Sequence, residues 1–154
     1  MNLYLIRHAD AVEGIGKPER PLSPRGRDQV LALATFLQRS DLFQPAEFWH
    51  SPLDRSRETA ELLAGHLRLG VPQTSVPELQ PESDPRTVTQ RIRTASHAIA
   101  IVGHEPHLGA LATLLVTGKM DSAAFVMKKC SALALEGESG HWSVRWHVSP
   151  DLIK

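Results

Sequence analysis

The chain has 154 residues, of which 42% are hydrophobic and 22% are charged, and 17 basic residues balance 17 acidic ones. A chain of this length and composition is typical of a globular protein that builds its own core. The zero net charge argues against nucleic acid or an anionic membrane as a partner. The lone Cys130 excludes a disulfide within the chain, so we expect a reducing, cytoplasmic setting.

The first residues of the chain are typical of a β-strand. Residues 2–6 form a short apolar run with no basic leader before it. Apolar runs elsewhere fall far short of the roughly 20 residues that a transmembrane helix needs. We therefore expect neither a signal peptide nor a membrane-spanning segment.

Two cap-and-proline signals mark the first two helices. Apolar residues spaced by three and four predict a helix over 24–39, with Ser23 as its N-cap. After a strand over 46–50, Ser51-Pro52 repeats this signal for a helix that stops by Gly70. The later predicted elements are a strand over 73–76, a helix opened by Asp84-Pro85, a very apolar and central strand over 98–102, a helix from Pro106 to Gly118, and an antiparallel pair over 131–135 and 142–148 with a turn between Gly137 and Gly140.

The alternation of strands and helices indicates the fold class. It predicts an α/β protein, a three-layer α/β/α sandwich with a mostly parallel central sheet. No linker interrupts the pattern, so we expect one domain over residues 1–154. The long loop from Ala11 to Leu22 is a candidate functional segment, because structureless loops of this length are often functional.

Polar side chains with chemical potential follow three of the predicted strands. Ligands of open α/β sheets bind beyond the carboxyl ends of the strands, where helix N-termini also favour anions. Each group taken alone is more often a surface pair, a helix cap or a structural histidine. Their coincidence favours a phosphate site with a nucleophile inside it. The groups are Arg7 and His8 after the first strand, Ser51, Asp54, Arg55 and Arg57 after the second, and Gly103, His104 and Glu105 after the central one.

Other known site types do not fit. His104 and His107 are three residues apart, whereas the zincin helix needs its histidines four apart, so we expect no metal site. Gly118-Lys119 lacks the rest of a nucleotide P-loop. Lys128 and Lys129 are interpreted as a solvated strand edge.

Five motifs follow one another along the chain. They are Leu5-Ile6-Arg7-His8-Ala9-Asp10-Ala11, Arg20-Pro21-Leu22-Ser23-Pro24-Arg25-Gly26, the segment from Ser51 to Ala60, Pro77-Glu78-Leu79, and Val102-Gly103-His104-Glu105-Pro106. The set spans the whole chain, and the order is more specific than any single motif. It resembles the histidine phosphatase superfamily, which includes the phosphoglycerate mutases, and above all its SixA-type phosphohistidine phosphatases. Ala9 stands where the superfamily usually has Gly, which adds a methyl group beside the phosphate.

The resemblance implies a role for four residues. His8 is the nucleophile that becomes phosphorylated, Arg7 and Arg55 clamp the phosphoryl oxygens, and His104 completes the pocket. The chemistry agrees, because a neutral imidazole attacks through one nitrogen only if an acceptor holds the other N–H. Two arginines and a protonated His104 can stabilise phosphoryl transfer without metal or cofactor.

The sequence offers several candidates for the general acid. Glu78, Asp10 and Glu13 are candidates, and Arg20, Asp10 and Glu78 are candidates for binding the substrate. Expelling an alkoxide demands a proton donor, whereas expelling imidazole from a protonated phosphohistidine does not. A site without a firm acid therefore favours phosphohistidine on a phosphotransfer protein as the substrate. The alternatives are a small phosphomonoester with Glu78 as acid, and a phosphate-binding module without turnover.

Overall fold

The computed structural model describes residues 1–14, 19–120, 124–138 and 140–153. Strands and helices alternate through most of the chain, as the sequence predicts. In chain order they are β1 (Asn2–Arg7), α1 (Pro24–Ser40), β2 (Glu47–His50), α2 (Asp54–His66), β3 (Gln73–Ser75), the short 3₁₀ helix η1 (Pro77–Leu79), α3 (Pro85–Thr94), β4 (Ile99–Gly103), α4 (His107–Thr117), β5 (Ala132–Glu138), β6 (His141–Val148) and the 3₁₀ helix η2 (Pro150–Leu152).

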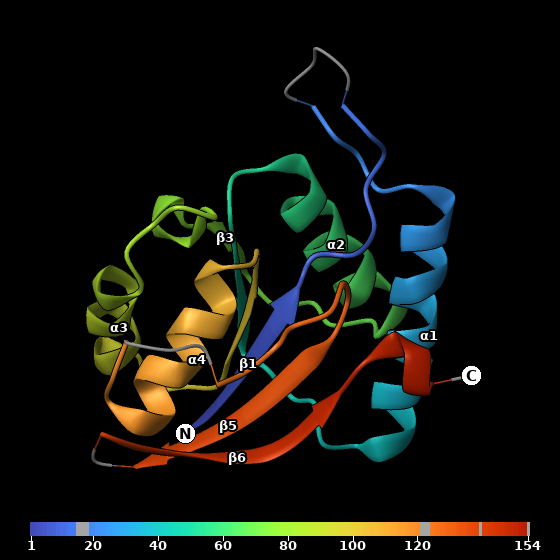
Figure 1. Ribbon diagram of the computed structural model, residues 1–154. Coiled ribbons are helices and arrows are strands. Elements are labelled where there is room, and N and C mark those ends of the chain that lie inside the picture. The colour runs from blue at the N-terminus through green and yellow to red at the C-terminus, as the bar shows by residue number, and fades with distance from the viewer. Residues whose placement is uncertain (15–18, 121–123, 139, 154) are drawn as a thin grey trace.

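The strands form one sheet in the order β3-β2-β4-β1-β5-β6 (Figure 1). The first four of these run parallel to one another, whereas β5 runs antiparallel to both β1 and β6. The middle pair, β1 and β4, is in register from Leu3 opposite Ile99 to Arg7 opposite Gly103. The predicted central position of the strand at 98–102 is confirmed.

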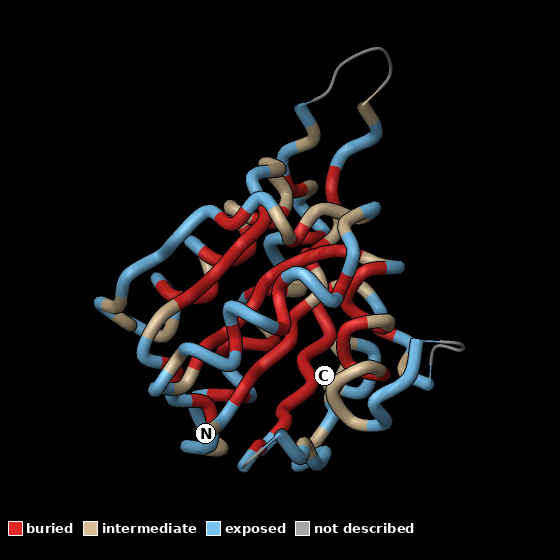
Figure 2. The backbone as a smooth tube through the Cα atoms, turned by 90° about the vertical axis from the view of Figure 1, so that its left-hand side faces the viewer, coloured by how far each residue is buried: buried red, intermediate tan, exposed pale blue. Residues whose placement is uncertain are grey.

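Helices cover both faces of the sheet. Successive side chains of a strand point to opposite faces, so Tyr4 and Ile6 of β1 pack under α1 and α2. Leu3 and Leu5 pack under α3 and α4. The two helix pairs lie on opposite sides of the sheet in Figure 1, and Figure 2 shows the central strands buried between them. The predicted three-layer α/β/α sandwich is confirmed.

Three helix ends lie where their capping residues predict. The Ser23 hydroxyl accepts from the Gly26 N–H at 3.0 Å and starts α1. The Asp84 carboxylate accepts from the Arg86 N–H at 2.9 Å and starts α3. Gly118 ends α4 with a φ of 76°, a left-handed conformation that glycine adopts without strain.

Helix α2 differs from its prediction at both ends. Its N-cap is Leu53, without a side-chain cap, so the interpretation of Ser51 as the cap is wrong. Ser51 still continues the strand, because its N–H donates to the Val102 carbonyl at 3.2 Å. The helix ends at His66, before Gly70, and Arg68 takes a positive φ of 55°.

The loop after β1 closes on itself through a bridge between Ala11 and Leu22. Residues 15–18 of this loop lie outside the described residues. So do residue 139 in the predicted turn between Gly137 and Gly140, and residue 154 of the predicted domain.

Candidate active site

The carboxyl ends of β1 and β4 bring the two histidines of the predicted site together. Because these strands are parallel neighbours, the chain leaves both at the same edge of the sheet. The His8 N–H donates to the Gly103 carbonyl at 2.9 Å, which continues the strand pairing by one residue. The ring centroids of His8 and His104 lie 5.0 Å apart. The predicted convergence of these side chains is therefore present.

The His8 ring is held in one orientation by the backbone. Its Nδ1 lies 2.7 Å from the Ala9 carbonyl oxygen, so Nδ1–H donates and Nε2 keeps its lone pair. The pKa of His8 is lowered to about 4, chiefly by burial and also by the charges of Arg55 and Arg7, against the Ala9 bond that raises it. A neutral imidazole with a free nitrogen is the form that a nucleophile requires.

His104 is held by two serine hydroxyls. Its Nε2 lies 2.5 Å from Ser51 Oγ and 3.1 Å from Ser56 Oγ. The pKa of His104 is lowered to about 3, chiefly by burial and also by the nearby His8 and Arg55. The ligand-free site therefore disfavours a protonated His104, because a buried imidazolium beside cations is costly. Its protonation during phosphoryl transfer stays a prediction. Its Nδ1 is buried without a hydrogen-bond partner in the described part of the chain.

Arg7 and Arg55 carry positive charge into this edge of the sheet. Arg7 Nη1 donates to the Met127 carbonyl at 3.0 Å, which aims its guanidinium from the segment before β5. The Nε atoms of both arginines are buried and without a partner among the described residues. Burial lowers the pKa of Arg55, as does the charge of Arg20. Guanidinium groups gathered in this way favour an anion that can accept in a bidentate manner.

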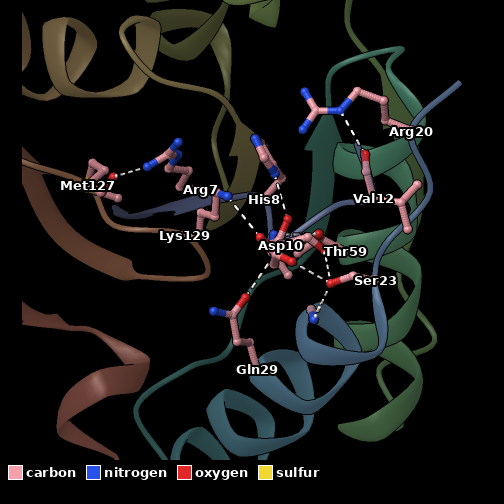
Figure 3. A network of polar contacts seen from close by, with 12 residues as sticks. Arg7, His8, Asp10, Val12, Arg20, Ser23, Gln29, Thr59, Met127 and Lys129 are labelled. Carbon is pink, nitrogen blue, oxygen red and sulfur yellow. Dashed lines mark hydrogen bonds and ion pairs between the residues drawn. The ribbon is translucent and has the colours of Figure 1, made fainter. Parts of the chain in front are cut away.

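Arg20 and Arg57, two other cations of the motifs, lie differently. Arg20 Nε donates to the Val12 carbonyl at 3.0 Å, which fixes the loop arginine (Figure 3). Its charge also lowers the pKa of Arg55. Arg57 instead pairs with Asp54 at 3.1 Å and Glu61 at 3.2 Å along the surface of α2. Arg20 thus stays a candidate for binding the substrate, whereas Arg57 is a surface residue with its charge already paired.

Asp10 is engaged by its neighbours on both carboxylate oxygens. Oδ1 accepts from Lys129 Nζ at 2.9 Å, and Oδ2 accepts from the Ser23 hydroxyl at 2.6 Å (Figure 3). These bonds hold the pKa of Asp10 below its ordinary value, so it is a poor proton donor. Lys129 lies in a turn before β5, and the prediction of a solvated strand edge is wrong for it. Its charge also lowers the pKa of His8.

The remaining acid candidates also lie outside direct contact with the histidines. Glu78 Oε2 pairs with Arg91 Nη1 of α3 at 3.3 Å. Glu13 is exposed on the loop after β1. Glu82, which the sequence did not single out, follows η1, and its charge raises the pKa of Arg55. Of these carboxylates, only Glu82 acts on the pKa of a predicted phosphate ligand.

For several residues of the site, the sequence gives no sign of the contacts that they make. Ser51 and Ser56 hold His104, and the Thr59 hydroxyl accepts from the Ala9 N–H at 3.0 Å. The segment from Ser51 to Ala60 contains a motif, but the position of a hydroxyl group in the sequence does not reveal which distant residue it contacts. The Ala9 side chain is buried in the core under α1 and α2, and its place beside the phosphate stays a prediction.

The part of the chain that the structure describes holds neither a cluster of metal ligands nor a membrane-spanning helix. No group of three or more His, Cys, Asp or Glu side chains there is placed to hold a metal ion. Among the same residues, no helix combines the length and the apolar character needed to cross a bilayer.

Comparisons with known proteins agree with this geometry. An uncharacterized protein of Picosynechococcus is 30% identical over 160 residues, covering 99% of this chain and 94% of its own length. A structure of the protein histidine phosphatase SixA complexed with tungstate has a TM-score of 0.87 at 24% identity and full coverage of both chains. A structure assigned as an α-ribazole-5′-P phosphatase of Escherichia coli K-12 has a TM-score of 0.80 at 20% identity, covering 97% and 98% of the chains. The histidine phosphatase superfamily (branch 1) model matches residues 3–81, more than half of the chain. The chain therefore belongs to the histidine phosphatase superfamily.

Proposed function

We propose that this protein hydrolyses phosphohistidine, carried by a partner protein, through a covalent phospho-His8 intermediate. The free Nε2 of His8 attacks phosphorus while Nδ1–H stays on the Ala9 carbonyl. A new N–P bond forms on His8 as the N–P bond of the substrate breaks, and the substrate imidazole leaves. Water then attacks the phosphorus of phospho-His8 and releases phosphate and free His8.

Arg7, Arg55 and His104 have the task of stabilising the transferring phosphoryl group. Phosphoryl transfer depends mainly on positioning and on charge stabilisation. Both guanidinium groups have unpartnered buried Nε atoms within the described ranges, and an anion would relieve the crowding of positive charge there. A bound dianion would also favour protonation of His104, whose ligand-free pKa is about 3.

The observation that carries the choice of substrate is the position of the three candidate acids: Glu13 is exposed on the loop after β1, and the other two are held by neighbouring side chains. Glu78 pairs with Arg91, and Asp10 accepts from both Ser23 and Lys129. A leaving imidazole, whose conjugate acid has a pKa of about 6.5, departs without a proton from the enzyme. An alkoxide does not, since its conjugate acid resembles water with a pKa of about 16. This arrangement supports phosphohistidine over a sugar phosphate.

The test compares substrates and traps the intermediate. A phosphorylated phosphotransfer protein and a panel of phosphomonoesters are assayed side by side with the wild type, His8→Ala and Glu78→Gln. We expect turnover of the phosphohistidine protein, one phosphoryl group on the wild-type enzyme by intact mass, and none on His8→Ala. Glu78→Gln should keep its phosphohistidine rate. A wild-type enzyme that binds the phosphoprotein but never carries phosphate would instead identify a binding module.

A second candidate is a phosphomonoesterase acting on a small metabolite. Glu82 favours it, because its carboxylate is near enough to raise the pKa of Arg55. The likeness to the structure assigned as an α-ribazole-5′-P phosphatase points the same way. In this reading Glu82, in place of Glu78, protonates the leaving oxygen.

Paired variants separate the two candidates. If a phosphomonoester is the substrate, Glu82→Gln should lower its rate by about 10²–10⁴, the usual worth of general acid catalysis. Glu78→Gln, whose parent carboxylate pairs with Arg91, is the matched control. The loss should shrink for aryl phosphates, whose leaving groups have pKa values of about 10 or below. A Glu82→Gln enzyme with unchanged phosphomonoester hydrolysis would eliminate Glu82 as the acid.

A further inference from the structure

A buried threonine joins the backbone of the nucleophile to the helix that carries Arg55. The Thr59 hydroxyl accepts from the Ala9 N–H at 3.0 Å and donates to the Arg55 carbonyl at 2.7 Å. Thr59 is fully buried, so no water competes for either bond. Figure 3 shows Thr59 reaching from α2 to the segment that follows His8.

The same peptide segment orients the His8 ring. The Ala9 carbonyl lies 2.7 Å from His8 Nδ1, while the Ala9 N–H is taken by Thr59. Ala9 is itself fully buried, so its N–H has no access to solvent if Thr59 releases it. A buried N–H left without an acceptor is costly, and the backbone would shift to avoid it. Any such shift moves the carbonyl that fixes the tautomer of His8.

Thr59 also fixes the position of His8 relative to Arg55. Arg55 is the second residue of α2, and Thr59 lies one turn further along the same helix. Its bond to the Arg55 carbonyl keeps the hydroxyl in one rotamer, in which the remaining lone pair meets Ala9. The single side chain of Thr59 thereby fixes the positions of both His8, the proposed nucleophile, and Arg55, a proposed phosphate ligand.

From this geometry we propose that Thr59 is a positioning residue, which fixes the His8 tautomer and its register with Arg55 through Ala9. The inference rests on the proposed function of His8 as the nucleophile. Thr59 touches neither of the reacting nitrogens, and its effect reaches them through the backbone. We therefore expect the His8 tautomer and turnover to depend on the hydroxyl of Thr59 and not on its γ-methyl group.

The test uses two substitutions that separate the hydroxyl of Thr59 from its γ-methyl group. Thr59→Val removes the hydroxyl and keeps the shape, whereas Thr59→Ser keeps the hydroxyl. The ¹⁵N chemical shifts of the His8 ring are recorded in the ligand-free enzyme, together with tungstate affinity and turnover. We expect Thr59→Val to lose the single Nδ1–H tautomer and to lower kcat/KM by about ten- to a hundredfold. Thr59→Ser should restore both properties.

Thr113 of α4 provides a matched control. Its hydroxyl also donates one turn back, to the Gly109 carbonyl at 2.8 Å, and accepts from a remote backbone N–H, that of Ala124, at 2.9 Å. Thr113→Val should therefore lose similar bonds and stability without altering the His8 tautomer. A Thr59→Val enzyme with wild-type His8 shifts, even if less stable, would overturn the proposal. The His8 shifts need no substrate, so this result is distinguishable from a wrong substrate assignment.

Discussion

The two imidazoles at the centre of the site are kept neutral by their surroundings. His8 is 6% exposed and His104 is 1% exposed, so water cannot solvate an imidazolium form of either ring. Burial is the largest cause of both lowered pKa values, about 4 for His8 and about 3 for His104. A phosphoryl dianion between the rings would act in the opposite direction, because it favours the charged form of each.

The first prediction concerns these titrations. In the ligand-free enzyme, the ring resonances of His8 and His104 should titrate with midpoints of about 4 and about 3, and not with the ordinary histidine midpoint of about 6.5. Addition of vanadate should move both midpoints upward. NMR titration of ring-labelled protein, assigned with His8→Ala, measures this directly. A midpoint near 6.5 for His8 without ligand would show that the ring is solvated and that its nucleophilic form is not secured by burial.

Arg55 supports a second prediction at this scale. Arg55→Lys keeps the charge but loses the planar fork that holds two phosphoryl oxygens. Losing one charge-assisted bond costs about 1.5–3 kcal/mol, or roughly ten- to a hundredfold in kcat/KM. Arg57→Lys is the control on the same helix, because Arg57 pairs with Asp54 and Glu61 at the surface. Equal rates for Arg55→Lys and the wild type would mean that Arg55 does not hold the phosphoryl group.

The sequence predicts part of the site, and the limit is physical. Arg7, His8 and His104 could be placed because they follow apolar strands, and parallel strands end at one edge of a sheet. The contact partners of Ser51 and Lys129 could not be predicted. Their roles depend on contacts with His104 and Asp10, 53 and 119 residues away in the chain. A local sequence pattern contains no information about contacts between residues so far apart in the chain.

At the scale of elements, the start of α1 is packed against the segment that follows the nucleophile. A Cβ atom built on Gly26 would lie 2.0 Å from the Asp10 carbonyl oxygen. The Ser23 N–H donates to the same oxygen at 3.0 Å, and the Asp10 N–H donates to Gln29 Oε1 at 2.9 Å. The first turns of α1 therefore hold Asp10, two residues after His8, by direct backbone contact.

The third prediction follows from this contact. In Gly26→Ala the added methyl group meets backbone, so α1 must move, which should cost roughly 1–3 kcal/mol of stability and lower turnover. Gly65→Ala in α2 is the control, since nothing lies within 4 Å of its added Cβ. That variant should be more stable than the wild type by up to about 1 kcal/mol. Denaturant unfolding and kcat/KM of both variants test the contrast; similar behaviour of the two would contradict it.

Periodicity succeeds for elements whose burial is set by one face. The apolar residues of the predicted helix at 24–39, Val30, Leu33, Ala34 and Leu37, are all buried in α1. Local signals fail at Ser51, where a serine before a proline predicts a helix cap. In the structure β2 pairing extends to the Ser51 N–H, and the hydroxyl meets His104. Tertiary contacts outweigh the local capping preference there.

At the scale of the whole molecule, burial disfavours the protonated form of three histidines, His8, His104 and His107, which are ordinary bases when the chain unfolds. Burial lowers the pKa of His107 to about 4, as it lowers those of His8 and His104. Unfolded histidine has a pKa of about 6.5. Between about pH 6.5 and pH 4 the unfolded chain therefore binds protons that the folded chain excludes. Stability is fully present above the unfolded pKa and is lost as pH falls through this window.

We therefore predict that the free energy of unfolding falls steeply between about pH 7 and about pH 5, by up to about 1.4 kcal/mol per pH unit for each buried histidine. The lowered carboxyl pKa values of Asp10 and Asp84 contribute only at lower pH, since their ordinary value is 3.8. His107→Leu removes one of the three bases, at a ring without a hydrogen-bond partner in the described residues. Urea unfolding of this variant across the window should show a shallower pH slope. A slope equal to that of the wild type would mean that His107 is protonated to the same extent in the folded and unfolded states.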